Sequence, residues 1–176
     1  MKEHKGMRPQ DIVVLLKIIS LDNQEWKIID LAKQLYISQS EVSEALNRCK
    51  IAGLIDENKK NVRRLSLLDF LKYGLRYVFP AQPGAVVKGR PTAHSAPPLS
   101  KKIISSQDTY VWQDDEGIVR GQAIEPLYKN LIEAVKEDQK LYELIALIDA
   151  LRIGRVREIN LATDELRKRF KIEQPV

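Results

Sequence analysis

The sequence predicts a mainly α-helical protein with a small β wing, and three observations lead to this class. Apolar residues recur three and four positions apart in several segments, which is the spacing of a helix with one buried face. Two short β-like stretches enclose a basic turn at residues 58–61, as in a small hairpin. Five of the eight prolines fall within residues 80–100, where no helix can continue. We therefore expect three parts: a first domain over 8–79, a proline-rich extended segment with short strands over 80–124, and a C-terminal helical region over 125–172.

The composition is that of an ordinary folded protein. Hydrophobic residues make up 44% and charged residues 30%, and no apolar run approaches the roughly 18 residues that cross a bilayer. The N-terminus is charged and has no signal-peptide core, so we expect a cytoplasmic protein without membrane contact. Cys49 is the only cysteine, and His4 and His94 are the only histidines. These counts exclude an intrachain disulfide and argue against a metal site, and we expect no cofactor.

Three helices are expected in the first fifty residues. The first opens near Pro9, whose missing N–H costs nothing in a first turn. The second covers about 29–35, and a tight turn separates it from the third. Ser38 and Glu41 form a capping box that begins the third helix, and Gly53 is a natural cap for its C-terminal end.

A hairpin and a fourth helix are expected next. Residues 54–56 and 62–65 read as two strands around the basic turn. The fourth helix covers about 67–78 and ends at Pro80. Further along, we expect β-like pieces at 109–112 and 117–120, and helices at about 126–136, 139–152 and 155–170.

The third helix has an apolar face and a polar face. Val42, Leu46 and Cys49 hold it to the core. Its N-terminus at Ser38 offers free N–H groups to a phosphate. The polar face carries short or forked hydrogen-bonding side chains, the types that read base edges in a major groove: Gln39, Ser40, Ser43, Glu44, Asn47 and Arg48.

Positive charge is concentrated in the front part of the chain. Residues 1–104 carry 18 Lys and Arg against 10 Asp and Glu, whereas residues 105–176 carry 11 against 14. This distribution fits a polyanion-binding module joined to a part with another task. The hairpin contributes a basic cluster that we expect to contact phosphates or the minor groove: Lys59, Lys60, Arg63 and Arg64.

The order helix, helix, tight turn, helix, hairpin, helix is that of a winged helix-turn-helix domain. Residues 7–17, 30–35 and 38–46, followed by Gly53-Leu54-Ile55, resemble MarR-type winged-helix transcriptional regulators of bacteria. The resemblance covers about 70 of the 176 residues. It implies a module that binds double-stranded DNA. Because one winged helix reads few bases, we also expect a homodimer.

Two segments on the C-terminal side of this module allow other functional interpretations: the loop over 89–99 and a charged cluster near residue 154. His94 adjoins Ser95, but sequence neighbours rarely form a base and nucleophile pair, so we do not expect an enzyme. A proline-braced loop in which His94 bonds a backbone group is the favoured interpretation. Asp149 and Arg152 are expected to form a buried ion pair. The candidate contacts for a ligand or partner are Arg90, His94, Arg152 and Arg155.

The sequence therefore predicts a sequence-specific transcriptional regulator. Its recognition helix would enter the major groove, and its basic wing would hold the DNA backbone. The alternative is a protein-interaction adaptor, or an antitoxin-like partner, that binds a protein through the acidic C-terminal helices.

Overall fold

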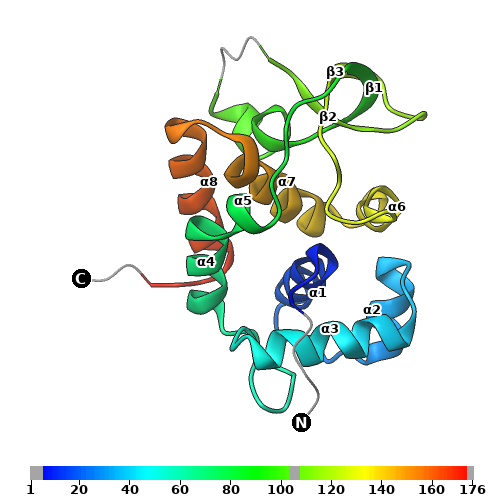
Figure 1. Ribbon diagram of the computed structural model, residues 1–176, viewed down its shortest axis with the longest axis vertical. Helices are drawn as coiled ribbons and strands as arrows, with labels where there is room; N and C mark the ends of the chain where they lie inside the picture. The colour runs from blue at the N-terminus through cyan, green and yellow to red at the C-terminus, as the bar shows by residue number, and fades with distance from the viewer. Residues whose placement is uncertain (1–5, 104–107, 174–176) are drawn as a thin grey trace. The chain divides into compact units, whose positions relative to one another are not determined.

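The computed structural model describes residues 6–103 and 108–173. Over these residues the chain is mostly helical, with eight α-helices and one small sheet of three strands (Figure 1). The contacts group the chain into two compact units. Unit 1 consists of the residues up to Leu67 together with Leu127–Leu141, and unit 2 consists of Leu68–Pro126 with the residues from Tyr142 onward. Each unit is described by itself.

Unit 1 is built around a buried first helix. Helix α1 (Pro9–Ser20) begins with proline at its first position, as expected, and ten of its twelve residues are buried. Helices α2 (Ile28–Leu35) and α3 (Gln39–Ile51) pack with it, and the short helix α6 (Leu131–Lys136) packs against α2. Tyr128 donates its hydroxyl to the Leu35 carbonyl at 2.8 Å, which ties the later segment to the end of α2.

The predicted ends of α2 and α3 are confirmed. Tyr36 ends α2 in the left-handed region, with φ of 54°. Ser38 then caps α3, because its hydroxyl accepts the Glu41 amide at 3.1 Å while the Glu41 carboxylate accepts the Ser38 amide at 3.1 Å. Gly53 takes a φ of 74° just beyond α3, a conformation that glycine adopts without a steric penalty.

The hairpin expected over 54–65 is a structured loop and not a pair of strands. Only one β-bridge joins its two sides, between Ile55 and Val62, and α4 (Arg64–Tyr73) begins where the second strand was expected. The Asp56 carboxylate accepts the amides of Lys60 and Asn61 at 2.7 and 3.1 Å. Two backbone bonds flank the bridge, from Asp56 N to the Asn61 carbonyl at 3.0 Å and from Arg63 N to the Leu54 carbonyl at 2.9 Å, and the side-chain bonds close the turn between them.

Unit 2 contains most of α4 and most of α7 (Gln139–Ile153), together with α5 (Leu75–Val78) and α8 (Val156–Arg169). The single helix expected over 67–78 is therefore divided at Gly74. Helix α6 begins five residues later than expected, after a stretch of turns. The bounds of α7 and α8 agree with the expected ones to within one residue.

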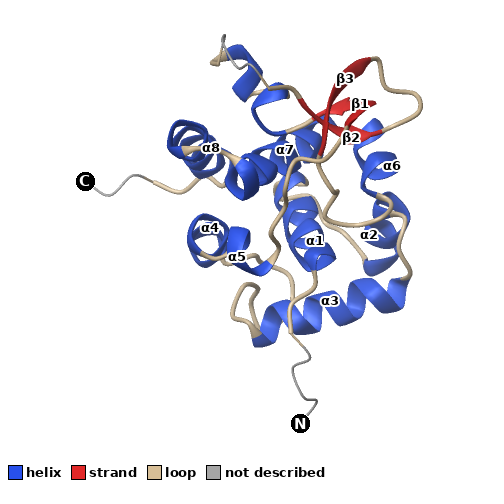
Figure 2. Ribbon diagram, turned by 45° about the horizontal axis from the view of Figure 1, so that its top comes forward, coloured by secondary structure: helices blue, strands red, loops and turns tan. Residues whose placement is uncertain are grey.

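The sheet of unit 2 lies where the proline-rich segment was expected to be extended (Figure 2). Strand β1 (Val86–Pro91) pairs antiparallel with both β2 (Tyr110–Gln113) and β3 (Val119–Ala123), and β2 and β3 pair in parallel over two residues. The three strands pair with one another at such close range that a side chain cannot fit at some positions, which must be glycine. A Cβ on Gly89 would lie 2.0 Å from the Trp112 carbonyl oxygen, and one on Gly117 would lie 2.3 Å from the Gly89 oxygen.

The sequence prediction missed β1 and placed β2 and β3 only in part. A strand in a proline-rich stretch has no strong local signal, because its partners lie twenty or more residues later in the chain. Two short 3₁₀ helices, Ala93–Ser95 and Leu99–Lys101, follow β1. None of the helices in the described part of the chain is both long and apolar enough to cross a membrane.

Candidate nucleic-acid interface

Helix α3 turns its polar N-terminal half toward solvent. Val42, Leu46 and Cys49 are at most 2% exposed and fix the opposite side of the helix in the core of unit 1. Of the predicted reading residues, Ser38, Gln39, Ser40 and Glu44 are exposed, and Ser43 and Asn47 are half-buried. The helix therefore presents hydroxyl, amide and carboxylate groups on one accessible surface.

The prediction that Arg48 lies on this surface is wrong. Arg48 is only 9% exposed. Its Nε donates to Asp11 Oδ2 at 2.8 Å and its Nη2 donates to Asp11 Oδ1 at 2.7 Å, a two-bond pair between α3 and α1. The hydrogen bond with Asp11 raises the pKa of Arg48. Arg48 keeps the contact with Glu44 that helical spacing indicates, with its Nη1 3.7 Å from Glu44 Oε2, but the packing of α1 on α3 brings the fully buried Asp11 carboxylate closer.

A second accessible group of cations lies on the loop over 56–64, which we call the basic loop. Arg63 is exposed, whereas Lys59 and Arg64 are half-buried. Lys59 adopts a φ of 57°, and its amide donates to the Asp56 carbonyl at 3.0 Å. These contacts fix the turn, and Lys60 and Arg63 are the exposed cations of the loop.

Lys60 is exposed but engaged within unit 1. Its ammonium lies 4.3 Å from the centre of the Trp26 ring and donates to the Trp26 carbonyl at 3.3 Å. This cation–π contact joins the basic loop to the segment between α1 and α2. Sequence reasoning gave Trp26 no role, because nothing local indicates that the loop folds back over its ring.

Asp56 is another residue of the basic loop that sequence reasoning missed. Its carboxylate accepts from the amides of Lys60 and Asn61, and also from the Asn61 side chain at 2.7 Å. Burial acts to raise the pKa of Asp56, but these hydrogen bonds outweigh it and lower the pKa. An aspartate at the start of a turn is a sequence signal that could have identified this role, because such side chains commonly accept backbone amides of the turn that follows.

One of the residues predicted as a contact in unit 2, Arg152, belongs to a buried polar cluster around Asp149. Asp149 is fully buried. Its Oδ2 accepts from Trp112 Nε1 at 2.7 Å and Thr92 Oγ1 at 2.8 Å, and its Oδ1 accepts from Arg152 Nη1 at 2.8 Å. Arg152 also donates to the carbonyls of Phe79 and Glu125. The predicted buried ion pair is confirmed, and burial raises the pKa of Asp149.

The other three predicted contacts in unit 2 differ in their burial and in their partners. His94 is buried and its Nε2 lies 2.8 Å from the Asp108 carbonyl oxygen, which confirms the expected backbone bond. Arg90 is half-buried, with its Nε 3.6 Å from Asp114 Oδ2. Arg155 is exposed at the start of α8. Of these, only Arg155 is open to solvent.

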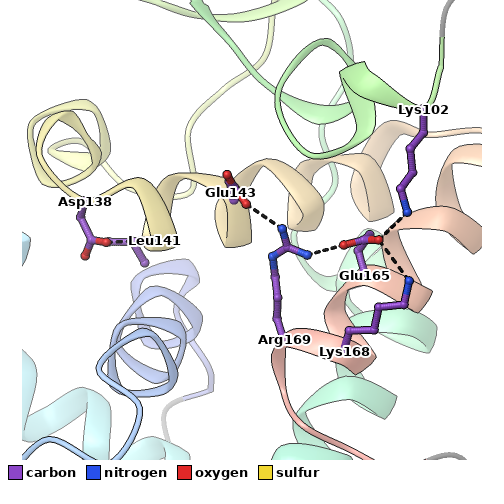
Figure 3. A network of polar contacts seen from close by, with 7 residues as sticks. All are labelled: Lys102, Asp138, Leu141, Glu143, Glu165, Lys168 and Arg169. Carbon is purple, nitrogen blue, oxygen red and sulfur yellow. Dashed lines mark hydrogen bonds and ion pairs between the residues drawn. The ribbon is translucent and has the colours of Figure 1, made fainter.

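A carboxylate on α8 organises a third polar cluster (Figure 3). Glu165 accepts from Lys102 Nζ at 2.5 Å and pairs with Arg169 and Lys168 of its own helix. Arg169 also pairs with Glu143 of α7 at 2.6 Å. Burial acts to raise the pKa of Glu165, but the bonds from Lys102 and Arg169 outweigh it and lower the pKa to about 2. This cluster joins α7, α8 and the segment after the second 3₁₀ helix.

Comparisons with known proteins do not place the chain in a family. No family model, curated protein or solved structure matches it. Among the residues that the structure describes, no group of three or more His, Cys, Asp or Glu side chains could hold a metal ion.

Proposed function

We propose that this chain is a sequence-specific regulator of transcription that binds double-stranded DNA through unit 1, as a winged helix-turn-helix protein does. Helix α3 acts as the recognition helix in the major groove, and the basic loop acts as the wing on the backbone. The observation that carries the proposal is that α3 has an accessible polar N-terminal face in the same compact unit as the closed basic loop with its exposed Arg63.

The chemistry of the two elements supports different tasks. Exposed Gln39 and Ser40, with half-buried Ser43 and Asn47, offer the neutral donors and acceptors that discriminate bases. Arg63 offers a charge that binds any phosphate. Glu44 has a side chain 56% exposed, and a carboxylate accepts from the amino group of cytosine. Arg48 has no direct part in the proposal, because its guanidinium holds Asp11.

The proposal includes a homodimer, since one recognition helix contacts too few base pairs for useful specificity. Light scattering after size exclusion would give the mass in solution. The adaptor alternative has less support. Two of the carboxylates that it would use, Asp149 and Glu165, are buried in internal ion pairs.

The test is binding of purified protein to a labelled duplex from the region upstream of its own gene, measured by fluorescence anisotropy over a range of salt. Asn47→Ala is expected to reduce discrimination between this duplex and a scrambled one by about 5- to 100-fold, the effect of one good base contact. Arg63→Ala is expected to weaken binding to both duplexes and to reduce the salt slope by about 0.9.

Lys129→Ala is the matched control, because Lys129 is an exposed lysine of unit 1 outside both elements. It is expected to leave affinity and salt slope unchanged. Absence of duplex binding at low salt would refute the proposal. So would equal losses in the Lys129 and Arg63 variants.

A further inference from the structure

Two large aromatic rings stand exposed on one side of the α4–α5 segment in unit 2. Tyr73 is 65% exposed and Tyr77 is 77% exposed. Two exposed cations, Lys72 and Arg76, lie beside them in the sequence. We call these four residues the α4–α5 face. Rings this exposed are uncommon on a folded surface, and a group of them marks a binding site more often than an isolated one does.

All four side chains lie away from the buried side of the segment. Gly74 N donates to the Phe70 carbonyl at 2.8 Å, and Val78 N donates to the Gly74 carbonyl at 3.1 Å, so Gly74 takes part in a helical turn on each side of the break. The burial pattern keeps a helical spacing through Gly74, because Leu71 and Leu75 are both buried four residues apart and residues 72, 73, 76 and 77 are all exposed. The opposite side is fixed in the core by Leu68, Leu71 and Leu75, each at most 1% exposed.

The cations and rings already interact. Lys72 Nζ lies 4.8 Å from the centre of the Tyr73 ring. Such a contact places a positive charge over one face of an exposed aromatic ring. A ligand that suits this face must therefore combine planar groups with negative charge at a regular spacing.

We propose that the α4–α5 face binds single-stranded nucleic acid. Bases stack on the rings of Tyr73 and Tyr77, while Lys72 and Arg76 bind the phosphates between them. Stacking surfaces combined with cations are the general means by which proteins hold single strands. In a duplex the flat faces of the bases are covered by their neighbours, so a duplex would leave both rings unused.

Replacement of Asp69 is expected to strengthen single-strand binding, in contrast to the other variants of this face. It is exposed one turn before Lys72 and Tyr73 on the same side of α4. Its carboxylate repels a phosphate strand laid along the face. Asp69→Asn is therefore expected to strengthen binding by a few-fold, an effect that damage to the fold would not produce.

The test is fluorescence anisotropy of the full chain with a labelled oligodeoxythymidine of about 15 nucleotides, which spans a typical single-strand site. An oligouridine of the same length compares RNA with DNA. Tyr73→Ala with Tyr77→Ala is expected to weaken binding at least tenfold, whereas Tyr73→Phe with Tyr77→Phe is expected to retain it, because stacking needs the ring and not the hydroxyl. Lys72→Gln with Arg76→Gln is expected to reduce the salt slope by about 1.4.

Tyr36 provides the positional control. It is a tyrosine 55% exposed in unit 1, and Tyr36→Ala is expected to leave oligonucleotide affinity unchanged. The proposal is overturned if the wild-type chain does not bind either oligonucleotide at low salt. Equal losses in the Phe and Ala pairs would also overturn it, and so would a change in oligomeric mass in the Ala pair, which would assign the face to contact between copies.

Single-strand binding by the α4–α5 face and duplex binding by unit 1 involve different residues. Variants of the α4–α5 face are expected to change single-strand affinity and leave discrimination by Asn47 intact. Failure of one assay therefore leaves the other proposal standing.

Discussion

Replacement of Arg48 by methionine tests whether this residue belongs to the core or to the DNA surface. Methionine keeps much of the apolar stem of arginine but removes both hydrogen bonds to Asp11, whose side chain is fully buried. An uncompensated buried carboxylate remains. Breaking a buried ion pair in this way costs about 3–5 kcal/mol of unfolding free energy. Arg48→Met is therefore expected to destabilise unit 1 severely.

A second variant separates lost packing from the unpaired charge. Asp11→Leu combined with Arg48→Met leaves two apolar side chains facing each other, and an apolar replacement of a buried pair is often neutral or stabilising. Asp11 also accepts the Arg8 amide at 2.9 Å, a cap on α1 worth roughly 1 kcal/mol. The double variant is therefore expected to recover all but about 1 kcal/mol of the loss.

Urea unfolding followed by circular dichroism measures both free energies, and the duplex assay reports on DNA affinity. If Arg48→Met unfolds within about 0.5 kcal/mol of the wild type, the range of an ordinary surface substitution, Arg48 does not belong to a buried pair that stabilises unit 1. The same conclusion follows if the folded single variant loses duplex discrimination while the double variant regains none of the lost stability.

Three further expectations follow from the structure. Glu165 has its pKa lowered to about 2 from 4.5, so it stabilises the folded state above about pH 4.5 and this contribution is lost as pH falls toward 2. The stability difference between wild type and Glu165→Gln, measured by urea unfolding, should shrink across that window, and a constant difference would contradict this account. Gly89→Ala would place a Cβ 2.0 Å from a carbonyl oxygen and is expected to lower the melting temperature strongly, whereas the control Gly84→Ala makes an ordinary contact at 3.5 Å. Asp56→Ala is expected to speed hydrogen exchange at the Lys60 amide and weaken duplex binding, with a stability loss near 1 kcal/mol because the turn is exposed. Unchanged exchange would show that other bonds hold the basic loop.

The amino-acid sequence alone determined the elements whose signals are local. Pro9 begins α1, and the Ser38 capping box begins α3 at the expected residue. Gly53 closes α3 because only its own backbone angles are involved. The prediction of the apolar face of α3 was also confirmed, because helical spacing alone determines which residues share that face.

Which polar groups remain accessible depends on tertiary packing. Arg48 lies at the edge of the α3 polar face by spacing, but α1 supplies Asp11 from 37 residues away and draws it inward. Lys60 is a surface cation by sequence, yet it lies over a ring 34 residues earlier. Strand β1 exists because β2 and β3 pair with it and Gly89 allows their backbones to approach. In each case the deciding partner is distant in the chain, so the pattern around the residue carries no record of it.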